Sequence, residues 1–402
     1  MRNLIATLLL FTLFNGSAFC LYNEPDHVIN FEMIGTNIIV PVVINNSTPL
    51  NFIFDTGIRH TIVTELYKND SLDLNYVREV TLHGLGEGEP LSTYLSTLNS
   101  MTIQTLRVDT VSLYALKQNI FQLSKHLGSK INGMIGYDLI KDHIVKIDYI
   151  KKCMYFYDPA TYKIPRSFKE VPVTIEDNKA YITANVILSG EEHKVKLLVD
   201  TGAELALWLV NSNFKHYRIP DQSIYTYIGQ GLNGEIFGSV SRIDKAAIGS
   251  YRFKKPIVAF PDSSAIEMII TSNERDGTIG SELLRRFHVI LNYPDTMMYV
   301  KRNIHYSQRF KYNTTGIEVV QPYQNLPFFE IAELWDESPA ANAGLRVGDK
   351  IESIDGQSVS TLTLIEVKEM LRKPSGKIRL NITRQNGDEL IHEKIKFKLF
   401  KL

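Results

Sequence analysis

Two aspartates, Asp55 and Asp200, each end an apolar run and are each followed by threonine and glycine. The two Asp-Thr-Gly tripeptides lie 145 residues apart. An unpaired buried carboxylate destabilises a fold, so two of them at the ends of apolar strands indicate a role beyond packing. Two carboxylates a few Å apart hold one proton between them. Such a pair can activate a water and protonate a carbonyl at once, which is the chemistry of metal-free peptide hydrolysis.

The threonine and glycine of each tripeptide have a place in the same site. Thr56 and Thr201 can each hydrogen-bond the backbone of the opposite loop and so lock the two loops together. Gly57 and Gly202 allow a close backbone approach that a side chain would prevent. We therefore expect the two carboxylates to titrate as one pair and not as two separate acids.

An internal repeat relates the two tripeptides. Ile131–Ile140 aligns without gaps on Arg275–Leu284, and this second pair of segments is offset by 144 residues. Two independent features that share one spacing indicate a duplicated domain. Two halves related by a two-fold axis would each place one carboxylate at the centre.

Each half is predicted to be mostly strand. The β-rich segments Asn37–Ile44 and Ala180–Leu188 end in turns and lead into the strands that carry the aspartates, so each pair is read as a hairpin. Short helices are expected at Tyr137–Lys141 and Ser281–Phe287, directly after an Ile-Gly pair.

A glycine-punctuated segment lies between the aspartate and the Ile-Gly pair of each half. Such segments suit mobile hairpin flaps that cover a cleft, exclude water and grip the substrate backbone. Plain turn glycines are the alternative, and phosphate loops are excluded because no Lys-Ser/Thr follows. The residues predicted to form the flaps are Gly84, Leu85 and Gly86 in the first half, and Gly229, Gln230 and Gly231 in the second.

The pattern changes from about residue 313. Phe328–Leu334, Lys377–Thr383 and Ile391–Phe400 are strand candidates, and Leu362–Arg372 has helical periodicity. Ser338–Leu345 is predicted to be a small-residue helical turn that ends in glycine. A third, separate domain is therefore expected at this end of the chain.

Composition places the chain among soluble globular proteins of two to three domains. Of 402 residues, 44% are apolar and 22% charged, and 44 basic side chains balance 44 acidic ones. No basic run or zinc spacing supports nucleic-acid binding. The acidic residues and histidines show no metal-ligand spacing, so neither a metal nor a cofactor is expected.

The first twenty residues are typical of an export signal. Arg2 is followed by an apolar run, Leu4–Phe14, that is too short to cross a bilayer, and small residues follow as a cleavage site. No transmembrane segment is expected after its removal, and the periplasm or cell envelope is the expected location. Cys20 leaves a lipid anchor open. With only Cys20 and Cys153, a disulfide framework is not expected.

The motifs apolar-Asp-Thr-Gly, Gly-x-Gly and Ile-Gly follow one another in this order twice along the chain. In this the sequence resembles the retropepsin/pepsin clan of aspartic peptidases. The closest resemblance is to bacterial exported members with two such halves and a C-terminal PDZ domain. The PDZ resemblance rests on Ser338–Ala341, Ala343–Leu345, Val347–Asp349 and Ile354–Gly356. It implies a mainly β fold, in which two homologous pepsin/retropepsin-like β-barrel lobes form one cleft and a bacterial-type PDZ domain follows.

The resemblance also implies roles and boundaries. It makes Asp55 and Asp200 catalytic and makes Thr56 and Thr201 an interlocking grip. It implies a polypeptide substrate, and a peptide or C-terminal tail bound by the PDZ domain, with Thr315, Gly316 and Ile317 as its carboxylate loop. The expected boundaries are 1–20 for the signal peptide, 21–160 and 161–312 for the two lobes, and 313–402 for the PDZ domain.

Three features depart from the pepsin pattern. Ile58 and Ala203 stand where a hydroxyl usually follows the tripeptide, which predicts a less acidic pair. Arg59 follows the first site and either lowers the pKa of Asp55 or is a solvated or substrate-facing charge. The first flap segment holds no tyrosine, for which Tyr94 or Tyr227 could substitute.

Three functions are weighed. The leading hypothesis is an exported aspartic endopeptidase with both lobes in one chain and a PDZ module for peptide recognition or regulation. The rival is a peptide-binding protein on the same scaffold without catalysis. A peptidase whose site forms between two copies of the chain is a third, which the duplication disfavours. Whether residues 21–30 form an inhibitory segment or an edge strand is open.

Overall fold

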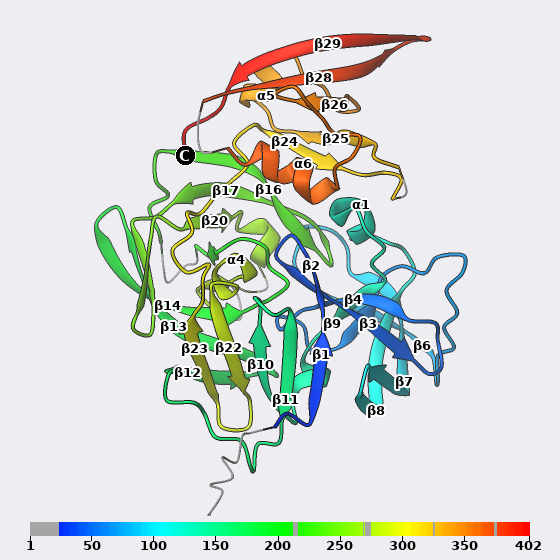
Figure 1. Cartoon of the computed structure of the whole chain (residues 1–402), viewed down its shortest axis with the longest axis vertical. Coiled ribbons are helices and arrows are strands. Elements are labelled where there is room, and N and C mark those ends of the chain that lie inside the picture. Colours follow the sequence, from blue (N-terminus) through cyan, green and yellow to red (C-terminus); the bar gives the residue numbers. More distant parts are fainter. Residues whose placement is uncertain (1–23, 212–215, 268, 270–274, 325, 374–375) are drawn as a thin grey trace, which may run out of the picture.

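The computed structural model describes residues 24–211, 216–267, 269, 275–324, 326–373 and 376–402. It consists of two β-rich lobes side by side and a smaller C-terminal domain placed across one end of them (Figure 1). This is the mainly β architecture expected from the sequence. The predicted signal peptide and Cys20 lie outside the described residues. In the part of the chain that is described, no helix is both long and apolar enough to cross a membrane.

Lobe 1 places the first aspartate at the end of a central, buried strand. Its sheet has the order β2-β3-β4-β9-β5-β8-β7-β6. Strand β4 pairs antiparallel with β3, as the hairpin prediction requires, and parallel with β9. The elements of lobe 1 are β2 (Glu32–Ile34), β3 (Asn37–Ile44), β4 (Leu50–Phe54), β5 (Thr61–Val63), β6 (Arg78–Leu82), β7 (Leu91–Ile103), β8 (Leu106–Leu116), α1 (Leu123–Leu127), β9 (Gly133–Ile135) and α2 (Tyr137–Ile140).

Lobe 2 repeats this plan. Strand β14 pairs antiparallel with β13 and parallel with β21, as β4 does with β3 and β9. The sheet continues through β15, β20 and β17 to β16. The elements of lobe 2 are β13 (Lys179–Leu188), β14 (Glu191–Val199), β15 (Leu207–Leu209), β16 (Ser223–Gly231), β17 (Gly234–Arg242), β18 (Lys245–Ile248), β19 (Tyr251–Lys254), β20 (Ile257–Pro261), η1 (Ser264–Ile266), β21 (Gly277–Ile279) and α4 (Ser281–Leu284).

The lobes share a sheet along their junction. Its order is β1-β11-β10-β22-β23-β12, and the antiparallel pair β10–β22 joins the two halves. Strand β1 lies at the edge of this sheet, so residues 27–30 form an edge strand. The elements of the junction are β1 (His27–Asn30), β10 (Ile144–Asp148), β11 (Cys153–Tyr157), β12 (Lys169–Glu176), β22 (Phe287–Asn292) and β23 (Met297–Arg302).

One helix prediction was too long. Helix α4 ends at Leu284, and Phe287 already begins strand β22. The Phe287 side chain is buried and packs in the main core, where the ring of Phe253 lies 5.6 Å away. Its burial in the sheet therefore outweighs the helical pattern of the preceding residues.

The C-terminal domain has its own hydrophobic core, separate from that of the lobes. Its sheet has the order β24-β25-β26-β28-β29, so β24 lies at one edge. Helix α6 begins with a capping box formed by Thr363 and Glu366. The elements are β24 (Ile317–Val320), β25 (Phe329–Leu334), α5 (Pro339–Asn342), β26 (Lys350–Ile354), β27 (Gln357–Ser358), α6 (Leu364–Leu371), β28 (Lys377–Asn386) and β29 (Glu389–Lys398).

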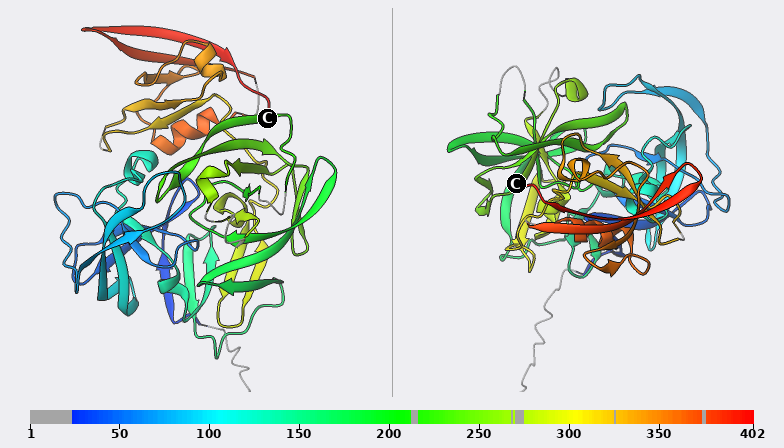
Figure 2. Two further views of the ribbon diagram at one scale, coloured as in Figure 1. Left: turned by 180° about the vertical axis from the view of Figure 1, so that it is seen from behind. Right: turned by 90° about the horizontal axis from the view of Figure 1, so that it is seen from above.

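The C-terminal domain faces both lobes. Seen from above, its ribbon overlies the region where the two lobes meet (Figure 2). Helix α6 and strand β24 are on the side of the domain nearest the lobes, next to α1 of lobe 1 and the β16–β17 hairpin of lobe 2 (Figure 1). Strand β29 is on the far side.

Candidate active site

The two aspartates occupy equivalent positions at the ends of β4 and β14. The Asp55 N–H donates to the Ile135 carbonyl at 2.8 Å, and the Asp200 N–H donates to the Ile279 carbonyl at 3.0 Å. These acceptors belong to the Ile-Gly segments that reveal the duplication in the sequence. The repeat therefore fixes the backbone of each aspartate in the same way.

Thr56 and Thr201 lock the two loops together with four hydrogen bonds. Each hydroxyl donates to a carbonyl of the other lobe, Thr56 Oγ1 to Val199 at 2.7 Å and Thr201 Oγ1 to Phe54 at 2.8 Å. Each hydroxyl also accepts from the N–H of the other threonine, at 3.1 Å in both directions. Both side chains are buried, so water cannot replace these bonds.

The two glycines let each carboxylate lie against the opposite loop. A Cβ atom added to Gly57 would lie 2.7 Å from Asp200 Cγ, and one added to Gly202 would lie 2.4 Å from Asp55 Oδ2. Such contacts are too short for any side chain, so only glycine fits. Both carboxylates therefore lie at one point between the lobes.

The pair is electrostatically unequal. Burial raises the pKa of Asp55 well above its usual range, and the nearby charge of Asp200 raises it further. The N–H groups of Gly57 and Ile58 lower the pKa in part. Asp55 is 8% exposed, whereas Asp200 is less buried. The backbone bonds do not distinguish the two: Asp200 accepts from the N–H groups of Gly202 at 2.9 Å and Ala203 at 3.0 Å, as Asp55 does from the equivalent N–H groups, so the difference is one of burial. The shared proton therefore favours Asp55.

The cation after the first tripeptide points away from this pair. Arg59 forms an ion pair with Asp177 at 3.0 Å, and both side chains are largely exposed. Of the two alternatives left open for Arg59, the structure supports the solvated charge. The prediction that Ile58 and Ala203, which lack a hydroxyl, make the pair less acidic stays a prediction.

The two glycine-rich segments lie at the ends of hairpins and bind each other. The Gly84 N–H donates to Asn233 Oδ1 at 2.6 Å, the Asn233 N–H donates to the Leu85 carbonyl at 2.8 Å, and Asn233 Nδ2 donates to the Gly88 carbonyl at 3.0 Å. A Cβ added to Gly231 would lie 2.0 Å from the Leu85 carbonyl oxygen. The two flaps are therefore clasped tip to tip.

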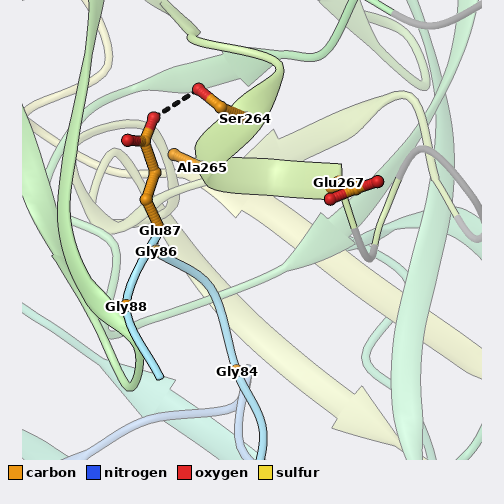
Figure 3. A pocket seen from close by; sticks show the side chains of 7 residues that line it. All are labelled: Gly84, Gly86, Glu87, Gly88, Ser264, Ala265 and Glu267. Atoms are coloured by element: carbon orange, nitrogen blue, oxygen red, sulfur yellow. Dashed lines mark hydrogen bonds between the residues drawn. The ribbon is translucent and has the colours of Figure 1, made fainter. Parts of the chain in front are cut away.

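The first flap also contacts η1 of lobe 2. The Gly86 N–H donates to the Ala265 carbonyl at 2.8 Å, and Glu87 accepts from the Ser264 hydroxyl. Figure 3 shows the Glu87 side chain directed at Ser264 from the loop between β6 and β7. These residues line a pocket of about 380 Å³ together with Glu267.

Each flap inserts a leucine into the opposite lobe. Leu85 of the first flap packs against Val210, Ile266 and Ile269 of lobe 2. Leu232 of the second packs against a lobe 1 cluster that includes Ile62. The flaps thus exchange apolar side chains as well as hydrogen bonds.

Not every predicted flap residue meets the other flap. Gly229 approaches Trp208 of its own lobe, and Gln230 donates locally to the Gly231 carbonyl. Tyr94 is 41% exposed, under the side chain of Lys117, and Tyr227 is close to the C-terminal domain, since the charge of Glu333 acts on it.

Sequence reasoning missed Asn233 and Leu232. Both lie in the second glycine-rich segment, between Gly231 and Gly234. An apolar and an amide side chain between two glycines was the feature of the sequence that could have indicated a contact at this tip. Only the folded chain brings them to lobe 1.

The predicted carboxylate loop of the C-terminal domain directly precedes the edge strand β24. Gly316 has a φ of +90°, and its carbonyl accepts from the Trp335 N–H at 2.9 Å. Ile317 is buried as the first residue of β24, and Thr315 accepts from the Ala340 N–H at its carbonyl. Among the described residues, no group of three or more histidine, cysteine or acidic side chains could hold a metal ion.

Comparisons with known proteins agree with this arrangement. Residues 40–139 and 182–283, one region in each lobe, match the family described as aspartyl protease, and residues 331–384 match the PDZ domain.

Individual relatives match only in part. A carboxy-terminal-processing protease of Bartonella bacilliformis is 37% identical over 90 residues, which are 22% of this chain and 20% of that protein. The PRKCA-binding protein of Homo sapiens is 26% identical over 100 residues, 23% of this chain and 24% of that protein. The chain therefore spans a quarter or less of these curated relatives. The two family matches cover about half of the chain and include both Asp-Thr-Gly loops, so the chain belongs to the aspartyl protease family and carries a PDZ domain.

Proposed function

We propose that this protein is an aspartic endopeptidase that hydrolyses peptide bonds with a water activated between Asp55 and Asp200. One observation carries the proposal: each carboxylate packs against the glycine of the other lobe, and the charge of Asp200 helps to raise the pKa of Asp55. A carboxylic acid and a carboxylate are thereby held together at one point, as acid–base catalysis requires.

The inequality of the pair assigns the two roles. Asp200, the less buried carboxylate, takes a proton from the water, whose oxygen forms a bond to the peptide carbon. Asp55 gives its proton to the carbonyl oxygen. The tetrahedral intermediate then collapses: the C–N bond breaks, the leaving amine takes the proton from Asp200, and Asp55 recovers its own. No group of the enzyme is consumed.

The flaps and the PDZ domain serve the substrate. The flaps part to admit a chain and close over it again. When closed, they exclude water and present backbone groups to the peptide. PDZ domains bind extended chains by adding a strand to a sheet edge, often with a carboxylate held by backbone amides. Thr315 and Gly316, which precede β24, and Ile317, its first residue, are proposed for that task.

We also propose that the protein works outside the cytoplasm. The apolar run after Arg2 and the small residues Gly16, Ser17 and Ala18 support export to the periplasm or cell envelope. Fractionation of cells that make the full chain, with N-terminal sequencing of the product, tests this. A chain that keeps residues 1–20 and stays in the cytoplasm would contradict it.

The function is tested by cleavage of an unfolded polypeptide from acid to neutral pH by the wild type, Asp55→Asn and Asp200→Asn. We expect each substitution to abolish cleavage. The rate of the wild type should fall as the pH rises through the raised pKa of Asp55, because the acid is then lost. Activity that survives in either variant would rule out the pair. Binding of peptides without cleavage at any pH would support the non-catalytic scaffold instead.

A further inference from the structure

The groove side of the PDZ domain lies against the protease lobes. Strand β24 is the edge of the PDZ sheet, and α6 packs beside it. An edge strand next to a helix is where such a domain takes an extended peptide. In this protein α1 of lobe 1 packs against β24 (Figure 1). The groove is thus closed from outside by a segment of the same chain.

The carboxyl end of α1 is hydrogen-bonded from both walls of the groove. From the strand side, the Gln321 N–H, directly after β24, donates to the Lys125 carbonyl at 3.1 Å. From the helix side, Lys368 Nζ donates to the His126 carbonyl at 3.1 Å. Carbonyls in the last turn of a helix have no partner within the helix and are free to accept. The PDZ domain supplies those partners.

Packing supports the same junction at three points of lobe 1. A Cβ added to Gly128, the residue that ends α1, would lie 2.7 Å from Leu364 Cβ. A Cβ added to Gly35 would lie 3.6 Å from Ile365 Cδ1. Gln324 Nε2 donates to the Tyr67 hydroxyl at 2.9 Å. Lobe 1 therefore contacts the end of the groove where β24 ends and α6 begins.

The second flap is tied to the PDZ side as well. Arg242, at the end of β17, donates to the Phe310 carbonyl at 2.9 Å and the Leu402 carbonyl at 3.1 Å. Thr226 of β16 is hydrogen-bonded to the partly buried Tyr312, which leads into the PDZ domain. Both strands of the flap hairpin thus contact the segment 310–312 that leads from lobe 2 into the PDZ domain, and β17 also contacts Leu402.

Charges confirm how close the surfaces are. Burial raises the pKa of Glu333 in β25 to about 7, with the charges of Glu318 and then of Glu235 as further causes. Glu235 belongs to flap strand β17 and is exposed, so a flap carboxylate lies near two half-buried PDZ carboxylates. The boundary between them is where flap and PDZ domain would separate.

We propose that the β24–α6 groove has the carboxyl end of α1 as its partner within the same chain, and that this docking is a latch that holds the flaps closed. The inference rests on the proposed protease function for its effect on cleavage. The docked form is the slow form of the enzyme. A polypeptide carboxyl terminus that adds along β24 meets α1 where the strand ends, at Gln321, so it competes with α1 and releases the flap.

A reversible disulfide tests the latch in the full chain. Lys125→Cys and Gln321→Cys are combined with serine at Cys20 and Cys153, since the 3.1 Å N···O contact brings the two backbones within the reach of a disulfide. We expect the oxidised protein to cleave an unfolded polypeptide at least tenfold more slowly than after reduction. The two single-cysteine variants should not respond to reduction. Equal rates in both redox states would overturn the proposal.

A second measurement does not depend on catalysis. Lys368→Glu removes the donor to His126 and places a negative charge beside Glu318, whereas Lys396→Glu makes the same change on the exposed far strand β29. We expect hydrogen exchange in residues 123–128 and 223–242 to become at least tenfold faster in Lys368→Glu and to stay unchanged in Lys396→Glu. Unchanged exchange in Lys368→Glu would overturn the latch even if the protein is an active protease. Faster exchange in a protein that never cleaves would keep the latch and refute the proposed function.

Discussion

The two Asp-Thr-Gly loops have the same backbone plan but different surroundings. Each aspartate is fixed by the Ile-Gly segment of its own lobe, and the threonine bonds agree within 0.1 Å between the lobes. However, Asp55 is the more buried carboxylate, whereas Asp200 is partly exposed. Duplication therefore supplies the symmetric geometry, and the local surroundings decide which carboxylate keeps the proton.

The two flaps differ in the same sense. In the second, strands β16 and β17 pair up to Gly231 and Gly234 at the tip, whereas in the first the glycine-rich loop lies beyond the last pair of β6 and β7, Leu82 and Leu91. Asn233 of the second flap hydrogen-bonds Gly84, Leu85 and Gly88 of the first. The second flap therefore supplies the asparagine that joins the two tips, and the first flap supplies the backbone groups to which it bonds.

The largest expected effect is that of a methyl group at the glycines of the active site. In Gly202→Ala the added carbon would lie 2.4 Å from Asp55 Oδ2, and in Gly57→Ala 2.7 Å from Asp200 Cγ. Either change forces the loops apart, and a displacement of 1 Å costs about hundredfold in rate. We expect about that loss of kcat in both variants, with the greater loss in Gly202→Ala. Steady-state kinetics on one peptide check this, and a variant within threefold of wild type would contradict the packing.

The threonine grip is expected to give the next largest effect, and an equal one in both lobes. Thr56→Val or Thr201→Val keeps the shape but leaves a buried N–H and a buried carbonyl unpaired, at a cost of about 1–3 kcal/mol for each group. Urea denaturation should show the same loss of unfolding free energy in both variants. Thr61→Val is the matched control, because that buried hydroxyl contacts only a sulfur atom, at 3.8 Å. Unequal losses would break the symmetry of the grip.

The symmetric part of the site could be predicted from the sequence and the asymmetric part could not. The aspartates, the hairpins and the duplication are short-range patterns that repeat at one offset. The clasp joins Gly84 to Asn233, residues 149 positions apart, and depends on how two lobes pack. Likewise, nothing local in Lys125–Gly128 indicates a contact with the PDZ domain. Such contacts arise from the assembly of complete domains.

Asn233→Ala should weaken the contact between the two flap tips. It removes two side-chain hydrogen bonds of the clasp, each contributing about 0.5–1.5 kcal/mol. The flaps must part before a polypeptide enters, so we expect kcat/KM to rise about threefold to tenfold. Asn342→Ala, on the PDZ domain, is the matched control and should change nothing. A fall in kcat/KM would indicate that the Asn233 amide grips the substrate instead of restraining the flap.

The smallest effect is expected at Arg59, although its place in the sequence suggested that it could lower the pKa of Asp55. Arg59 follows the first tripeptide, but its guanidinium is paired with Asp177 in a largely exposed ion pair. Exposed pairs contribute about 0–1 kcal/mol, and solvent screens their charge from a buried carboxyl. The pKa of Asp55 is raised chiefly by burial and by Asp200, and it is lowered by the N–H groups of Gly57 and Ile58. We therefore expect Arg59→Ala and Asp177→Ala to leave the pH profile of kcat/KM unchanged. A shift confined to Arg59→Ala would mean that this charge reaches the pair when substrate is bound, and the division of roles would then depend on Arg59 as well as on burial.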